Sequence, residues 1–185
     1  APELLYPIPR QLKRDELGIA ATSLPFVGED IWNAYEVSWL NLRGKPVVAL
    51  ATFRVPADSP NLIESKSFKL YLNSFNQTAF ADVATVEATL VGDLSTAAGA
   101  PVGAKIELLS GRPQVLVGYP EGTLLDDLDI ACDAYQPAPA LLATVDGENV
   151  EKTVEETLYS HLLKSNCLVT GQPDWAMVVI RYRGR

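Results

Sequence analysis

One eleven-residue segment occurs twice in this chain, and this repeat limits the possible folds more than any other feature of the sequence. Residues 44–54 read GKPVVALATFR, and residues 171–181 read GQPDWAMVVIR. Four identities share the offset 171 − 44 = 127. Each copy reads as a tight turn followed by an apolar strand that ends in arginine. Chance is the alternative explanation, but the flanking residues also read as paired strands, which favours duplication.

The first copy extends into a longer pattern. Apolar alternation predicts strands, and apolar residues at helical spacing, such as Phe68, Leu72 and Phe75, predict helices. The order is strand, strand, helix, helix, strand, strand, at residues 31–42, 47–55, from 64, 81–97, 105–109 and 129–135.

These elements predict three parts of the chain. Residues 1–30 form an N-terminal extension, 31–149 the first module, and 150–185 the first strand pair of a second module. By the same offset, the second module's helix would begin at 64 + 127 = 191, beyond Arg185. Since Met177 is the only methionine, we expect a piece of a longer protein or a chain without its original first residue.

Composition excludes several classes of function. A net charge of −8 and a pI near 4.6 argue against binding to a nucleic-acid backbone. No apolar run reaches the length of a membrane span. One histidine and two cysteines cannot build the usual closed zinc sites, and so few cysteines indicate a reducing cytoplasm. No glycine-rich dinucleotide fingerprint follows a strand, so any dinucleotide must bind in another geometry.

A thiol and a carboxyl group lie on the two sides of one short turn. Cys167 and Asp174 bracket residues 168–173, which pairs a soft nucleophile with a proton donor on a hairpin. The alternative is an inert, half-buried thiol. At the 127-residue offset, the first copy has Leu40 and Val47 at these positions, so only the second copy carries the reactive pair.

The other cysteine and the histidine have simpler interpretations. Alternation in residues 129–135 predicts that Cys132 faces the core together with Ile130 and Ala134. His161 lies six residues before Cys167 on the same strand, about 20 Å away, which is too far for proton transfer. We therefore expect a surface or interface histidine, and hydrolysis is disfavoured.

A second group of polar residues precedes the first helix. Glu64 could simply be a carboxylate stabilised by the helix dipole, and Lys66 and Lys69 could form a solvated face. The functional interpretation is that the Glu64 carboxylate accepts two hydrogen bonds from the edge of a guanine-like base. The N–H groups of the helix start, with Ser65 and Lys66, suit a phosphate.

These residues resemble a known family. Residues 64–71, ESKSFKLY, together with SHLLKSNC (160–167) and QPDW (172–175), are similar to the motifs of the NADPH-dependent 7-cyano-7-deazaguanine reductases. These enzymes are the nitrile reductases of queuosine biosynthesis, a tRNA modification pathway. The resemblance covers nearly the whole chain and is to the longer, duplicated members.

The resemblance implies an α+β tunnelling fold, in which an antiparallel sheet carries a helix pair on one face, duplicated here with the second unit incomplete. It implies a cytoplasmic homodimer that contains no metal. Cys167 would attack the nitrile carbon to form a thioimide, and Asp174 would supply protons. Ile63, Glu64 and Ser65 would bind the deazapurine, while Ser65 and Lys66 would contact NADPH, and the product would be the primary amine.

The family also uses a His-Glu pair and an Arg-Gly pair that find no match before Arg185, so we expect feeble turnover at most. The alternative function is a non-catalytic tunnelling-fold module for binding or assembly. A zinc-dependent cyclohydrolase of the same fold is disfavoured because the metal ligands are missing.

Overall fold

The computed structural model describes residues 1–111, 118–136, 138–143, 153–167 and 170–184. Contacts divide the chain into two compact units, residues 1–115 and 116–185. This division differs from the expected boundary at 149/150, because a strand at residues 123–124 pairs with the second hairpin. Among the described residues, no helix is both long and apolar enough to cross a membrane.

A three-stranded antiparallel sheet forms the centre of the first unit. Its strands are β2 (Glu29–Leu40), β3 (Pro46–Pro56) and β5 (Gly103–Leu108), in the order β2-β3-β5. Every second residue of β3 from Ala49 to Val55 is buried, which is the period of a strand with one covered face. The three strands expected in this region are confirmed.

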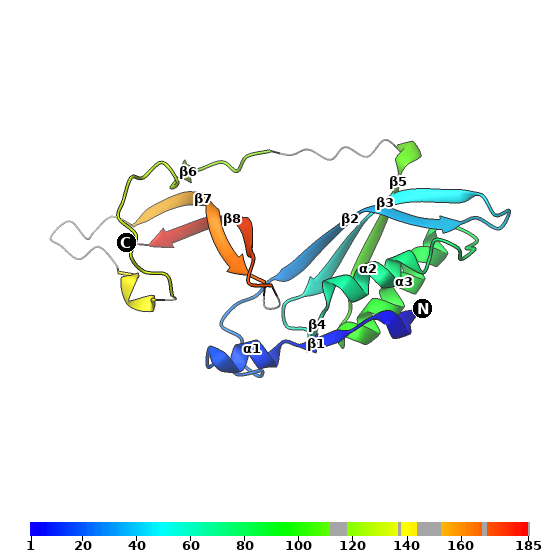
Figure 1. Cartoon of the computed structure of the whole chain (residues 1–185), viewed down its shortest axis with the longest axis horizontal. Coiled ribbons are helices and arrows are strands. Elements are labelled where there is room, and N and C mark those ends of the chain that lie inside the picture. Colours follow the sequence, from blue (N-terminus) through cyan, green and yellow to red (C-terminus); the bar gives the residue numbers. More distant parts are fainter. Residues whose placement is uncertain (112–117, 137, 144–152, 168–169, 185) are drawn as a thin grey trace. The chain divides into compact units, whose positions relative to one another are not determined.

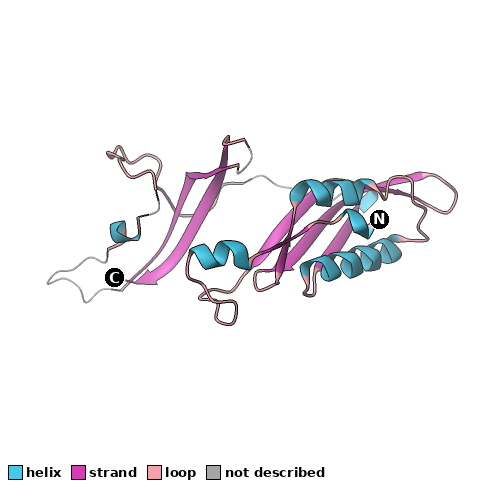
Figure 2. Ribbon diagram, turned by 60° about the horizontal axis from the view of Figure 1, so that its bottom comes forward, coloured by secondary structure: helices cyan, strands magenta, loops and turns pink. Residues whose placement is uncertain are grey.

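Two helices cover one face of this sheet, α2 (Ser65–Asn73) and α3 (Val83–Ala98) (Figures 1 and 2). Asp82 caps the start of α3 by accepting a hydrogen bond from the Thr85 N–H at 2.8 Å. Four α3 side chains at four-residue spacing are fully buried: Val86, Leu90, Leu94 and Ala98. The expected helix pair is confirmed, and the first unit is an α+β structure.

The N-terminal residues are part of the first unit rather than an extension outside it. They form a short 3-10 helix (Pro2–Leu4), β1 (Pro7–Pro9) and α1 (Gln11–Glu16). Strand β1 pairs antiparallel with β4 (Asn61–Ile63), and Leu5 lies in the hydrophobic core. The sequence did not indicate this strand because β1 is only three residues long and contains two prolines.

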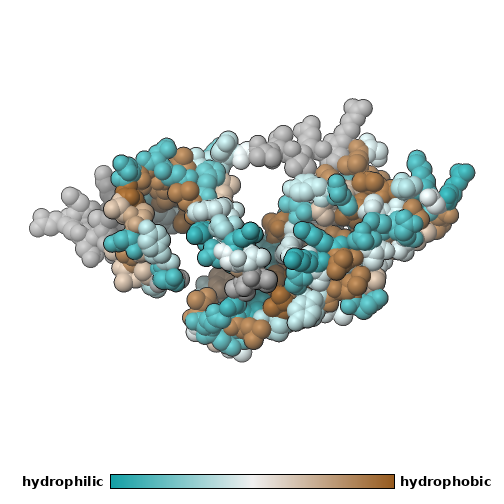
Figure 3. All heavy atoms as spheres, viewed as in Figure 1, coloured by the Kyte–Doolittle hydropathy of each residue, from teal (hydrophilic) through white to brown (hydrophobic). Residues whose placement is uncertain are grey.

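The second unit contains a long hairpin and one short strand. The hairpin is β7 (Val154–Asn166) with β8 (Pro173–Gly184), and β6 (Thr123–Leu124) pairs parallel with β7. Two 3-10 turns, Leu109–Gly111 and Pro139–Leu141, lie in the first and second units respectively. Apolar residues are visible at the surface of both units among hydrophilic ones (Figure 3).

The expected strand at residues 129–135 is wrong, and so is the expected burial of Cys132. These residues form no helix or strand, and Cys132 is exposed. Ile130, on the supposed core face, is 66% exposed. Alternation indicates a strand only where another layer covers one face, and every residue from 129 to 135 is exposed.

Both hairpins contain a register shift at the same place. In β2–β3, the pairing shifts after Ala34, so that Tyr35 and Glu36 lie opposite Leu50. In β7–β8, the shift lies opposite Met177. The two positions differ by 177 − 50 = 127, which is the offset of the sequence repeat.

Candidate functional site

The polar group before the first helix is the N-terminal cap of α2. Glu64 has an extended backbone, and its side chain accepts hydrogen bonds from the main-chain N–H groups of Lys66 at 2.9 Å and Ser67 at 2.6 Å. These hydrogen bonds, that of Lys66 first, hold the pKa of the Glu64 carboxyl below its usual value of 4.5. The carboxylate is therefore ionised and held in one orientation.

This cap changes how the first turn can bind ligands. The N–H groups of Lys66 and Ser67, which the sequence analysis offered to a phosphate, already donate to Glu64. An anion here must use the exposed side chains of Ser65 and Lys66 instead. Ile63 is only 4% exposed and belongs to the hydrophobic core, so its side chain packs inside the first unit.

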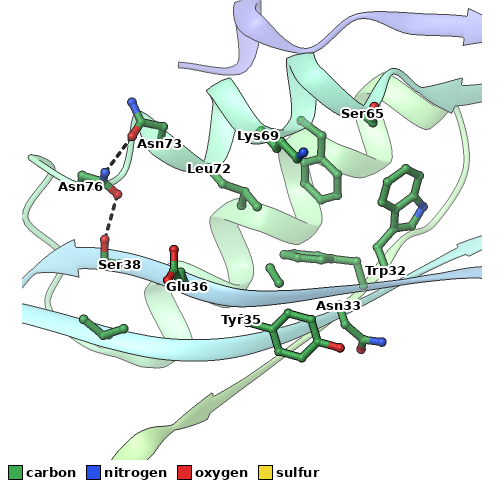
Figure 4. Close-up of a pocket in the computed structure, with 14 residues that line it drawn as sticks. Trp32, Asn33, Tyr35, Glu36, Ser38, Ser65, Lys69, Leu72, Asn73 and Asn76 are labelled. Atoms are coloured by element: carbon green, nitrogen blue, oxygen red, sulfur yellow. Dashed lines mark hydrogen bonds between the residues drawn. The ribbon is translucent and has the colours of Figure 1, made fainter. Parts of the chain in front are cut away.

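A groove of about 890 Å³ lies between β2 and α2, and the sequence analysis missed it (Figure 4). Trp32, Tyr35 and Phe68 supply aromatic surface, while Lys69 and Ser65 line it from α2. Ser65 is the one expected site residue among those that line the groove. The signal in the sequence was the pair of aromatic residues Trp32 and Tyr35 within the strand expected at residues 31–42.

Hydrogen bonds hold the far end of this groove. The Ser38 hydroxyl donates to Asn76 Oδ1 at 2.8 Å, and the Asn76 amide donates to Asn73 Oδ1 at 2.8 Å (Figure 4). The N–H of Leu40 also donates to the Thr78 carbonyl at 2.9 Å, which ties the end of β2 to the segment after α2. The groove therefore has a fixed polar end, although β2 is an edge strand.

In the second unit, Cys167 immediately follows β7 and is half-buried. Its main-chain N–H donates to the Gln172 carbonyl at 2.9 Å, and its carbonyl accepts from the Gly171 N–H at 2.9 Å. Gly171 has a φ of 67°, a left-handed conformation that glycine adopts without strain. The main chain on both sides of the thiol is therefore fixed by the turn.

The turn of the first hairpin is one residue shorter but closes with the same two kinds of main-chain hydrogen bond, and Asn41 takes the position of Cys167. Asn41 donates its N–H to the Lys45 carbonyl at 2.9 Å and accepts from the Gly44 N–H at 2.9 Å. The expected counterpart of Cys167 was Leu40, and that assignment is wrong. Residues 41–45 connect β2 to β3, and residues 167–172 connect β7 to β8, so the second turn is one residue longer. Equivalent residues of the two hairpins are therefore 127 positions apart after the turn but only 126 positions apart before it.

Asp174 lies on the other strand of the same hairpin. It is exposed and pairs directly with Ser165, two residues before Cys167. Residues two apart on a strand share a face, so Cys167 and Ser165 face the same side. The hydrogen bond from the Cys167 N–H to the Gln172 carbonyl continues the strand pairing, so that Cys167 lies opposite Gln172. Cys167 and Asp174 are thus diagonal neighbours across the hairpin, a relationship that typically separates side chains by roughly 7–8 Å.

His161 lies at the register shift in the middle of β7. Its ring makes edge-to-face contacts with Tyr159 at 5.7 Å and Tyr119 at 6.0 Å between centroids. Its main-chain N–H donates to Asp126 Oδ2 at 3.0 Å. This half-buried aromatic setting matches a structural histidine better than a catalytic base for Cys167.

The expected residues therefore form two groups. Glu64, Ser65 and Lys66 gather at the start of α2, and Cys167 and Asp174 share one hairpin turn. Within the described ranges, no three His, Cys, Asp or Glu residues lie close enough together to hold a metal ion.

Comparison with known proteins identifies the family of this chain. The model for "Nitrile reductase, 7-cyano-7-deazaguanine-reductase N-term" matches residues 1–106. The chain belongs to this nitrile reductase family. The family assigned from residues 64–71 and 160–175 is confirmed.

Individual members of the nitrile reductase family are similar along the whole chain. A protein from Dechloromonas aromatica named NADPH-dependent 7-cyano-7-deazaguanine reductase is 73% identical over 185 residues, which is 100% of this chain. Proteins of the same name from Aromatoleum aromaticum and Cupriavidus metallidurans are 66% and 59% identical, over 100% and 98% of this chain. The chain spans 64–65% of the length of these three relatives.

Proposed function

We propose that this chain belongs to an enzyme that reduces the nitrile of 7-cyano-7-deazaguanine to the primary amine with NADPH, in queuosine biosynthesis. The observation that carries the proposal is the 73% identity over all 185 residues to a reductase of that name. The two groups of polar side chains support it, because the reaction needs both base recognition and a nucleophile beside an acid.

Glu64 is the residue proposed to recognise the base. Its lowered pKa keeps the carboxylate ionised, and an ionised carboxylate is a strong acceptor for the N–H groups of a guanine-like edge. Each carboxylate oxygen offers two acceptor positions, so the cap of α2 leaves capacity for a ligand. Ile63, the residue before Glu64, is proposed to line the same site, and Ser65 contributes its exposed side chain.

Cys167 and Asp174 are the residues proposed to carry the covalent step. The Cys167 thiol loses its proton to solvent, and its sulfur then forms a bond to the nitrile carbon while one π bond of the nitrile breaks and its electron pair goes to nitrogen. The Asp174 carboxyl donates a proton to that nitrogen, which gives a neutral thioimide. A separation of roughly 7–8 Å between diagonal neighbours leaves room for a carbon and a nitrogen between the two groups.

Ser65 and Lys66 are the residues proposed to contact NADPH. Both side chains are exposed at the start of α2, and Lys66 forms no ion pair among the described residues, so its ammonium suits a phosphate. Each NADPH would supply one hydride when bound, so two successive NADPH molecules would take the nitrile to the amine. Lys66 and Ser65 bind and orient each NADPH, while Asp174 holds the proton at the nitrogen.

Intact-mass measurement after incubation with 7-cyano-7-deazaguanine tests the covalent step. We expect the mass to rise by one nitrile molecule, with peptide mapping that assigns the adduct to Cys167. Cys167→Ala should abolish the adduct. Cys132→Ala is the matched control and should retain it, because Cys132 is exposed and far from either expected group in the sequence. An adduct on Cys132 alone, or none at all, would favour the non-catalytic binding module.

Replacement of Asp174 by Asn separates the acid from the nucleophile. An amide keeps the size of the side chain but cannot donate the carboxyl proton, so the adduct should form while its reduction slows by about 10²–10⁴-fold. NADPH consumption by a preformed adduct measures this step. Loss of adduct formation with unchanged reduction would assign Asp174 another role.

We also propose that the two hairpins are copies of one tunnelling-fold unit and that the protein assembles as a homodimer. Two features support duplication: the register shifts at the 127-residue offset and the matching turns at Asn41 and Cys167. Strand β2 lies at the edge of its sheet, bonded there to residues 78–80 at its Leu40 end, and an edge strand is compatible with assembly through strands. Light scattering coupled to size exclusion tests the dimer, and a monomer at all concentrations would contradict it.

A further inference from the structure

Ser67, in the first turn of α2, is a buried polar residue with two hydrogen-bond partners. It is 7% exposed. Its hydroxyl donates to the main-chain carbonyl of Glu64 at 2.7 Å and accepts from the main-chain N–H of Tyr6 at 3.0 Å. A buried hydroxyl with both partners satisfied favours one geometry, because loss of either hydrogen bond leaves a polar group unpaired away from water.

Tyr6 is bonded to the same turn through its other main-chain group. The Glu64 N–H donates to the Tyr6 carbonyl at 2.9 Å, and the adjacent Pro7 pairs with Ile63. Leu5, on the other side of Tyr6, lies in the hydrophobic core. The N-terminal segment, residues 5–9, is therefore anchored by packing and holds the start of α2 through two hydrogen bonds.

Hydrogen bonds hold both main-chain polar groups of Glu64 and its carboxylate. Its N–H is held by Tyr6, its carbonyl by the Ser67 hydroxyl, and its carboxylate by the N–H groups of Lys66 and Ser67. A binding group held in this way loses little conformational entropy when a ligand arrives.

We propose that Ser67 is a positioning residue for substrate recognition: with the N-terminal segment, it fixes the Glu64 carboxylate for the donor edge of the deazapurine. This inference rests on the proposed function, in which Glu64 binds the base. Ser67 acts through Glu64 and does not itself touch the substrate.

The test compares Ser67→Ala with Ser74→Ala in the 185-residue chain. Ser74 is the matched control, because it also lies beside α2, donates to the Tyr71 carbonyl at 2.6 Å and accepts from the N-terminal ammonium at 3.3 Å. It tests loss of a similar hydroxyl at the opposite end of the helix. Two quantities are measured: the Kd for 7-cyano-7-deazaguanine by calorimetry, and the pKa of the Glu64 carboxyl by carbon NMR.

Ser67→Ala should weaken nitrile binding by roughly tenfold, as expected for loss of a buried hydrogen bond that orients the acceptor. It should also raise the Glu64 pKa part of the way to its ordinary value. Ser74→Ala should change neither quantity. If Ser67→Ala does not fold, Ser67→Cys replaces it, since a thiol fills the space but is a weak hydrogen-bonding group.

The two measurements distinguish failure of the inference from failure of the proposed function. An unchanged Kd and an unchanged Glu64 pKa in the Ser67 variant overturn the positioning role. If the unaltered chain does not bind the nitrile, the proposed function fails, and the Glu64 pKa alone decides whether Ser67 positions that carboxylate. A change of equal size in Ser74→Ala also overturns the positioning role, because it would reflect a general loosening of α2.

Discussion

Asn41 and Cys167 occupy equivalent positions in two turns of one chain. The main-chain N–H of each residue donates to the carbonyl of the last turn residue, which is Lys45 in the first turn and Gln172 in the second. The main-chain carbonyl of each accepts from the N–H of the glycine that precedes this last residue. The glycines, Gly44 and Gly171, have φ values of 76° and 67°. The first unit thus has a side-chain amide where the second unit has the thiol proposed as nucleophile.

The Asn41 side chain stabilises its own turn. Its Oδ1 accepts from the N–H groups of Arg43 at 2.9 Å and Lys45 at 3.0 Å. We expect Asn41→Ala to lower the free energy of unfolding by about 1 kcal/mol, as the two N–H groups lose this acceptor. Asn41→Asp keeps the acceptor oxygen and should retain most of the stability. Urea denaturation measures both variants, and equal losses would show that the oxygen does not stabilise the turn.

Alkylation by iodoacetamide distinguishes access from activation at the two cysteines. At pH ~9.5 most ordinary thiols are ionised, so access decides the rate, and exposed Cys132 should react at least as fast as half-buried Cys167. Peptide mass spectrometry at several times gives both rates. If Cys167 reacts faster only near pH 7, its thiolate is stabilised by its surroundings. A faster Cys167 at both pH values would contradict the burial described above.

Two glycines of α3 should respond in opposite directions to alanine. A Cβ at Gly92 would meet no atom within 4 Å, so Gly92→Ala should raise the free energy of unfolding by about 0.5–1 kcal/mol through helix propensity. Gly99 ends the helix at a φ of 71°, and a Cβ there would lie 3.2 Å from Pro60 Cγ. Gly99→Ala should cost roughly 1 kcal/mol or more. Urea midpoints that move in the same direction would refute this contrast.

The cap of α2 should make stability depend on pH. The Glu64 pKa is lowered in the folded state, chiefly by the N–H of Lys66 and then by that of Ser67. The ionised cap therefore contributes its stability above the ordinary value of 4.5, and this contribution is lost as the pH falls through the folded pKa. The unfolding free energies of the unaltered chain and Glu64→Gln should converge between pH ~6 and ~3. A difference that is independent of pH would contradict the cap.

Local patterns in the sequence were sufficient where each element buries one face against a neighbouring layer. The alternation in β3 and the four-residue spacing in α3 predicted both elements to within about two residues, as is usual for element ends. The same reasoning failed at Cys132, whose neighbours alternate in the same way but are all exposed from residue 129 to residue 135. Periodicity records a preference for burial, and burial itself needs a partner surface.

The chemistry of the site divides in a similar way. Residue types and spacing alone identified Glu64, Cys167 and Asp174 as candidates and, through their resemblance, the family. Tertiary structure decided that the α2 N–H groups are already bonded to the Glu64 carboxylate, that Tyr6 and the Ser67 hydroxyl hold the main chain of Glu64, and that Asn41 is the counterpart of Cys167. Each of these facts depends on hydrogen bonds whose partners are set by strand register and turn length. A difference of one residue in the length of a turn changes which residues of the two hairpins are equivalent along the whole strand before that turn.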